Sequence, residues 1–250
     1  MKPADLIKLK YTNQAIYNKR AEIRAGFLDR SQNIHDGKIT RLSNLDLEIL
    51  FQLYDAFFLR SYFAEQFKGT LRFTLSTRMT RSAGMIHSPR NLPSLRPEEE
   101  HYEIKIGTGF LFNYSQLERD KRVNGIISRD SLEALQLVLE HEICHLVELH
   151  TCKTSSCRRQ PFKSLALQLF AHTEGHHHLP TGKEIAAVRD GFLPGMKVRF
   201  QHGGVTYSGV IYRITQRATV MVPQPRGDFQ DSRGNRYEKY YVPLAELTAE

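Results

Sequence analysis

Apolar residues recur at steps of three and four between residues 130 and 149, the spacing of a helix that packs on a core. These positions and the apolar ones beside them are Leu132, Leu135, Val138, Leu139, Ile143, Leu146, Val147 and Leu149. Apolar residues cover more than one stripe, so we expect this helix to be buried. Asp130 is a suitable cap for its first turn, and Glu133 three residues later completes a capping-box pattern.

Two further helices and three strands are expected before and after this segment. A wide aromatic and aliphatic stripe predicts a helix over residues 44–67, and a second apolar run predicts another over residues 162–170. Strict alternation at Leu71, Phe73 and Leu75 predicts a strand. Shorter strands are expected at 85–87 and 102–106, a short helix or turn at 110–117, and a polar connector at 118–129.

The pattern changes after Pro194, where short β-type runs lie close together. They are residues 196–200, 205–214, 218–222 and 237–242, separated by turn-forming residues. Strands at this density predict a small barrel of SH3 or Tudor type. The fold class is therefore expected to be α+β in three parts: a basic helical extension (1–43), a main domain (44–190) and a small C-terminal β-barrel (194–248).

Composition places the chain among soluble globular proteins with an affinity for polyanions. It has 250 residues and a net charge of +8, which favours contact with DNA or RNA. No apolar run reaches transmembrane length, the first residues lack the apolar core of a signal peptide, and three Cys do not form a disulfide framework. We therefore expect a cytoplasmic protein with no membrane contact.

The most informative motif lies inside the buried helix and reads H-E-x-x-H, from His141 to His145. Residues four apart project from the same helix face, so both imidazoles can occupy corners of a tetrahedral zinc site. Glu142 then lies beside the metal, where it can accept a proton from water instead of ligating. The motif predicts Zn²⁺ as cofactor, His141 and His145 as ligands, and Glu142 as the catalytic residue.

The third ligand is left open by the residues alone. The metzincin pattern needs Gly at position 148 and His at position 151, but Glu148 and Thr151 stand there, so that subclass is excluded. The remaining candidates downstream are His150, Cys157, His172, Glu174 and the run His176, His177 and His178.

Several segments together resemble the SprT-like zinc metalloprotease family. They are S-T-R-M-T-R-S-A-G at residues 76–84, the strand before the main helix, E-H-E-I-C-H-L at 140–146 and P-F-K at 161–163. The resemblance covers roughly residues 45–175. It implies a compact α+β zincin domain, two His ligands and a Glu general base. It also implies substrates among proteins bound or crosslinked to DNA, because a eukaryotic member of the family degrades such proteins.

The chain departs from that family in two ways. The family's third His stands in an H-G-x-x-F context, and Cys157 is the nearest equivalent here, with His172 as the alternative ligand. Many members carry a C-terminal zinc ribbon, which three Cys in the whole chain cannot form.

We also expect the strand 102–106 to serve as a rail for an extended peptide substrate.

Two functions follow as hypotheses. The first is a zinc-dependent metallopeptidase that hydrolyses peptide bonds through water activated by Glu142, acting on protein substrates associated with DNA. The alternative is a non-catalytic nucleic-acid- or chromosome-associated binding protein with a structural zinc site, for which a closed set of four protein ligands is expected.

Overall fold

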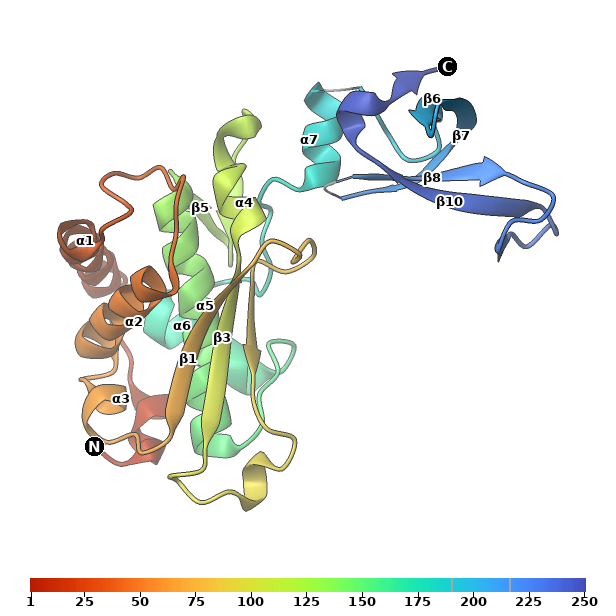
Figure 1. The fold of residues 1–250 in the computed structure, drawn as a ribbon. Helices are drawn as coiled ribbons and strands as arrows, with labels where there is room; N and C mark the ends of the chain where they lie inside the picture. Colours follow the sequence, from red (N-terminus) through yellow and green to blue (C-terminus); the bar gives the residue numbers. More distant parts are fainter. Residues whose placement is uncertain (190, 216) are drawn as a thin grey trace. The chain divides into compact units, whose positions relative to one another are not determined.

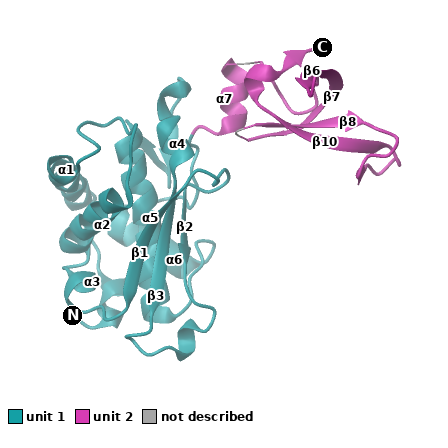
Figure 2. Ribbon diagram, in the orientation of Figure 1, with its two compact units in different colours: residues 1–179 teal, residues 180–250 magenta. Residues whose placement is uncertain are grey.

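The computed structural model describes residues 1–189, 191–215 and 217–250. They divide into two units, Met1–Leu179 (unit 1) and Pro180–Glu250 (unit 2), shown in Figure 2. Both units contain helix and sheet, which confirms the mixed α+β class. The expected boundaries at residues 43 and 190 do not coincide with this division.

The main sheet of unit 1 has three strands, as the alternating segments predict. They are β1 (Thr70–Ser76), β2 (Gly84–His87) and β3 (His101–Gly107), in the order β1-β3-β2. β3 pairs in parallel with β1 and antiparallel with β2. The prediction of β3 as a substrate rail is therefore wrong, because both of its edges are already paired. The edge strand nearest the H-E-x-x-H helix is β2.

The buried helix is α5 (Ser131–Cys152), which packs against β2 and β3 (Figure 1). Asp130 caps it by accepting a hydrogen bond from the Glu133 amide at 2.9 Å. The Glu133 carboxylate does not complete the capping box, since it accepts from the Arg129 amide instead. Lys153 ends the helix in the left-handed region.

The helix expected over residues 44–67 is interrupted. It forms α2 (Asn44–Phe58) and α3 (Tyr62–Glu65), because Arg60 and Ser61 adopt positive φ. The carboxylate of Asp55 accepts hydrogen bonds from the first amides of the new turn, those of Phe63 and Ala64. An apolar stripe does not reveal such a break, because the stripe continues across it.

The N-terminal segment forms part of unit 1. It contains a 3₁₀ helix, η1 (Pro3–Lys8), and α1 (Asn13–Arg30), whose apolar residues join the same core as α2 and α5. Arg20 of α1 also reaches α5, donating hydrogen bonds to both carboxylate oxygens of Glu140 at 2.6 Å. Residues 1–43 thus contribute buried apolar and charged groups to the main domain.

The polar connector expected at 118–129 is a β-hairpin. Its strands are β4 (Lys121–Val123) and β5 (Ile126–Ser128), joined by Asn124 and Gly125, both at positive φ. Asn-Gly is the preferred pair for this kind of turn. The remaining elements of unit 1 are η2 (Leu92–Ser94), α4 (Thr108–Phe112), η3 (Tyr114–Gln116) and α6 (Gln160–Phe170).

Unit 2 has its own apolar core and a six-stranded antiparallel sheet. The elements are α7 (Gly182–Arg189), β6 (Lys197–His202), β7 (Val205–Ile214), β8 (Ala218–Pro223), β9 (Phe229–Gln230), β10 (Arg236–Val242), η4 (Leu244–Glu246) and β11 (Thr248–Ala249). The order β11-β6-β7-β8-β10-β9 leaves β11 and β9 at the edges in the described part of the chain. The strands expected here are confirmed, and α7 was not expected.

Across the described residues, we find no helix with both the length and the apolar character that a bilayer crossing needs.

Candidate metal centre and active site

The two histidines of H-E-x-x-H lie on the same face of α5, as their spacing predicts. Their ring centroids are 4.9 Å apart. Phe162 of α6 packs against both rings, at 4.9 Å from His141 and 4.3 Å from His145. An aromatic side chain from a neighbouring helix therefore fixes the orientation of both imidazoles.

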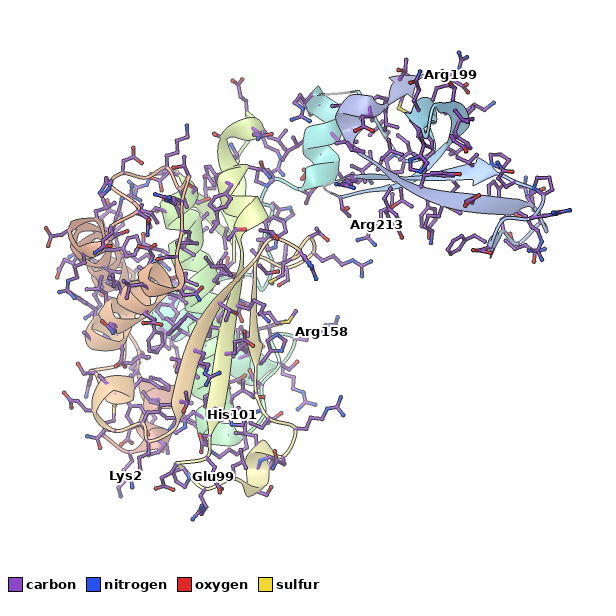
Figure 3. The ribbon with its side chains drawn as sticks, viewed as in Figure 1. Lys2, Glu99, His101, Arg158, Arg199 and Arg213 are labelled. Carbon is purple, nitrogen blue, oxygen red and sulfur yellow. The ribbon has the colours of Figure 1, made fainter. Side chains whose placement is uncertain are left out.

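Cys157 joins these histidines from the loop between α5 and α6. One ligand atom from each of His141, His145 and Cys157 lies within 4.8 Å of the other two. Arg158, the next residue, is exposed (Figure 3). The loop between α5 and α6 thus brings the sulfur of Cys157 to the histidine pair, while the next side chain, Arg158, faces solvent.

The other ligand candidates do not join this group among the described residues, although His176 and His177 line the same cavity. His172 is buried with Nε2 at 2.7 Å from a carboxylate oxygen of Glu140. His150 is buried between Glu100 and Tyr62, at 2.8 and 2.9 Å. Among the described residues, neither belongs to the group formed by His141, His145 and Cys157. Glu174, His176 and His178 form a separate exposed group.

The histidine pair is in the protonation state that a metal requires. Burial lowers the pKa of His141 to about 3, with His145 and His172 adding to the effect. Burial likewise lowers the pKa of His145 to about 4. Both imidazoles are therefore neutral at physiological pH and have lone pairs to donate.

A chain of contacts fixes the His145 ring. Its Nδ1 lies 2.7 Å from Oγ of Ser155, and that hydroxyl donates to the buried carboxylate of Glu148 at 2.5 Å. With Ser155 as donor to Glu148, Nδ1–H of His145 donates to Ser155. This arrangement leaves Nε2 as the free donor atom, as in many metal-ligating histidines.

The donor set fits zinc. Zinc binds His nitrogen at about 2.0–2.1 Å and thiolate at about 2.3 Å, so donors around a tetrahedral ion lie roughly 3.3–3.8 Å apart. The donor atoms of His141, His145 and Cys157 lie within 4.8 Å of one another, which is close to this spacing. In addition, Nδ1 of His141 is buried without a hydrogen-bond partner among the described residues. Three protein donors of the types that zinc prefers are thus already gathered.

Glu142 lies next to this group but is not part of it. Its side chain is buried and contacts β2, where a Cβ built on Gly84 would meet Oε1 at 2.5 Å. Burial raises the pKa of Glu142 to about 8. No hydrogen bond or ion pair to its carboxylate is found within the described ranges. This carboxyl group can therefore exchange a proton near neutral pH.

One cavity of about 420 Å³ contains all four residues. Its wall comes from the segment before β2 and from β2 itself, from the β4–β5 turn, from α5, from the α5–α6 loop and from residues 175–177. Besides His141, Glu142, His145 and Cys157, the lining residues are Ser82, Ala83, Gly84, Met85, Ile86, Ser88, Val123, Asn124, Val138, Leu149, Ser155, Gly175, His176 and His177. Glu142 and the group formed by His141, His145 and Cys157 therefore line one cavity.

Several residues that shape the site were not singled out by the sequence analysis. The side chain of Asn124 donates from Nδ2 to the Leu137 carbonyl of α5 at 2.7 Å. The backbone carbonyl of Asn124 accepts from the Thr173 amide. The Asn-Gly pair was a usable signal, because it marks a tight hairpin turn. Ser155 and Glu148 had no such signal, because their contact depends on how the α5–α6 loop folds back.

Comparison of the chain with protein-family models, with curated proteins and with solved structures gave no match.

Proposed function

We propose that this protein is a zinc-dependent metallopeptidase of the SprT-like zincin type. The observation that carries the proposal is the cavity in which His141, His145 and Cys157 converge beside the buried carboxyl group of Glu142. Three donors leave one position of a tetrahedral ion open, which is the arrangement of catalytic zinc sites.

Zinc held by His141, His145 and Cys157 would act as a Lewis acid toward a peptide carbonyl and a water molecule. Glu142 supplies the base. Its carboxylate takes a proton from the attacking water at Oε1 or Oε2 and passes it to the nitrogen of the leaving amine. Burial raises the pKa of Glu142 in the metal-free chain. A divalent cation beside the group would favour the carboxylate, the form that acts as base.

The neighbouring strand supports binding of an extended peptide. β2 pairs with β3 on one side, and in the strand order its other side is an edge. Residues of β2 and its flanks, including Gly84, Met85 and Ile86, line the cavity. A peptide added to this edge by backbone hydrogen bonds would run past Glu142. We therefore propose β2, and not β3, as the rail for an extended substrate.

Proteins bound to DNA are the substrates that we propose. The net charge of +8 favours association with polyanions. In unit 2, which we propose to be a module related to SH3 and Tudor barrels, Tyr207 and Tyr240 pack at 4.9 Å beside Phe200. Tyr212 and Tyr241 are exposed on the same unit, as are Arg199 and Arg213 (Figure 3). Exposed aromatic and basic side chains are the groups that bind single strands by stacking and by charge.

The alternative, a structural zinc site, needs a fourth protein ligand. His172 is the candidate. Its Nε2 contacts Glu140, and its Nδ1 is buried without a hydrogen-bond partner among the described residues. In the described part of the chain, however, His172 does not belong to the group in which donor atoms of His141, His145 and Cys157 lie within 4.8 Å of one another. A group of three donors favours the open, catalytic arrangement.

The test is the variant Glu142→Gln, which keeps the shape of the side chain but removes the base. Wild type loaded with zinc should cleave casein or a protein bound to DNA, and a chelator should abolish cleavage. The variant should retain the zinc content of wild type and lose cleavage. If zinc-loaded wild type cleaves neither substrate, the peptidase proposal fails and the binding protein is the better account.

A further inference from the structure

The segment after α6 continues the β4–β5 hairpin as an additional extended stretch. The Asn124 amide donates to the His176 carbonyl at 2.8 Å, and the His178 amide donates to the Arg122 carbonyl at 2.7 Å. Val123 and His177 form a β-bridge between these hydrogen bonds. Alternate side chains of an extended segment point to opposite faces.

The three consecutive histidines therefore have different environments. His177 points inward: its Nε2 is buried, and its ring contacts Phe110 at 4.8 Å between centroids. His176 and His178 are exposed, together with Glu174 two residues earlier. Glu174, His176 and His178 thus form an i, i+2, i+4 row on one face.

The donors of this row are already close together. One ligand atom from each of the three residues lies within 4.8 Å of the others. The His176 and His178 rings are 5.0 Å apart, and Nε2 of His176 lies 3.4 Å from a carboxylate oxygen of Glu174. The backbone is held by the hairpin and by Arg119, which donates to the His178 carbonyl at 2.7 Å. Little backbone ordering would accompany ligation, which lowers its entropic cost.

We infer that Glu174, His176 and His178 form a second divalent-metal site. Two imidazoles and one carboxylate select a transition metal such as Zn²⁺ over Mg²⁺ or Ca²⁺, which prefer all-oxygen sites. The site stands on this geometry alone and does not depend on the proposed peptidase activity. It binds more weakly than the first site, because its ligands are exposed to water.

Occupation of the second site would restrain one wall of the first. Gly175, within the same segment, lies near two proposed ligands of the first site, Cys157 and His141. A Cβ built on Gly175 would be 3.6 Å from the Cys157 carbonyl oxygen and 4.0 Å from Cε1 of His141. His176 itself lines the active-site cavity. Metal at the second site would therefore restrain a segment that lines the cavity.

Elemental analysis of the 250-residue chain gives the number of bound zinc ions. Titration calorimetry with Zn²⁺ gives their affinities. His178→Ala is the main variant, because His178 does not line the cavity. His35→Ala is the control, since His35 is also an exposed histidine. We expect two zinc ions in wild type and in His35→Ala, and one in His178→Ala and in Glu174→Ala. Because loss of an outer partner alone costs roughly 10- to 100-fold in affinity, loss of a ligand should cost at least about as much.

Combination with His145→Ala separates the two sites. That variant should keep the weaker ion, and the double variant with His178→Ala should keep none. If His178→Ala binds as many ions as wild type with equal affinities, the second site is refuted. If His178→Ala removes an ion and His145→Ala removes none, the second site holds and the proposed catalytic centre fails.

Discussion

Gly84 of β2 lies directly against Glu142 of α5. A Cβ built on Gly84 would stand 2.5 Å from Oε1 and 2.9 Å from Cγ of Glu142, and also 2.9 Å from Cγ1 of Val138. Real Cβ atoms do not come this close to other heavy atoms, so only glycine leaves Glu142 in its observed position. The last residue of the S-T-R-M-T-R-S-A-G segment therefore determines where the proposed base can lie.

Replacement of Gly84 by alanine should displace the Glu142 carboxylate without contacting the proposed metal ligands. We expect a loss in kcat of about a hundredfold, the effect of misplacing a catalytic group by about 1 Å. Zinc content should stay unchanged. Gly109→Ala is the control, because nothing lies within 4 Å of a Cβ built there. Equal peptidase rates for Gly84→Ala and wild type would contradict this role of Gly84.

Ser155→Ala should weaken zinc binding by removing the hydroxyl that orients His145. Loss of such a partner typically costs about 10- to 100-fold in metal affinity. Competition with a fluorescent chelator measures this change. Ser156→Ala alters the neighbouring hydroxyl in the same loop and should bind zinc as wild type does. Identical affinities for the two variants would show that the contact between His145 and Ser155 is dispensable.

Arg20→Ala should destabilise unit 1 strongly. Glu140 is fully buried, and although burial alone would raise its pKa, Arg20 and His172 lower the pKa of Glu140 to about 2. Removing Arg20 leaves a buried carboxylate with one partner fewer, which costs about 3–5 kcal/mol in unfolding free energy. Urea denaturation measures the change, and Arg20→Lys gives a milder variant that keeps the charge.

The matched control for Arg20 is an exposed ion pair. Lys68 and Glu98 are 3.5 Å apart with side chains 67% and 56% exposed. Lys68→Ala should change the unfolding free energy by less than about 1 kcal/mol. Similar small losses for Lys68→Ala and Arg20→Ala would refute the structural role assigned to the Arg20–Glu140 pair.

Asp46 should make the stability of unit 1 depend on pH in the acid range. Burial would raise its pKa, but hydrogen bonds from Ser31, Ser43 and Asn33 outweigh burial and lower the pKa of Asp46 below its ordinary value of 3.8. A carboxyl group with a lowered folded-state pKa stabilises the fold above its unfolded-state pKa. That contribution is lost as pH falls through the folded-state value.

Denaturation of wild type and Asp46→Asn at several pH values measures this contribution. The difference in unfolding free energy should be constant above pH 5 or so and should shrink below about pH 4. Asn33→Ala, which removes one donor to the carboxylate, should show a smaller pH dependence than wild type. If the difference in unfolding free energy between wild type and Asp46→Asn grew as pH fell, this role of Asp46 would be contradicted.

Patterns along the chain predicted the elements that carry the site but not the contacts that position its side chains. Period-two alternation located β1 and β3, and the apolar spacing with the Asp130 cap located α5, because local backbone preferences and burial act together there. The sheet order could not be predicted in the same way. Parallel pairing of β1 with β3 places β2 at the edge, and no local pattern specifies that.

In the candidate site too, contacts set by local spacing could be predicted, and contacts between distant parts of the chain could not. The spacing of His141 and His145 fixes their common helix face, so their proximity follows from sequence alone. Cys157 was one of several candidates, since its distance from the histidines depends on the path of the α5–α6 loop. Arg20 was assigned to a separate extension, because a contact across 120 residues of chain leaves no trace in residue spacing.

X-ray absorption at the zinc edge, on His178→Ala protein loaded with one equivalent of zinc, tests the proposed metal centre most directly. The account predicts two nitrogen ligands at about 2.0 Å, one sulfur at about 2.3 Å and a further light atom, with the sulfur lost in Cys157→Ala. A spectrum without sulfur, or one with two imidazoles replaced by oxygen ligands alone, would contradict the centre formed by His141, His145 and Cys157.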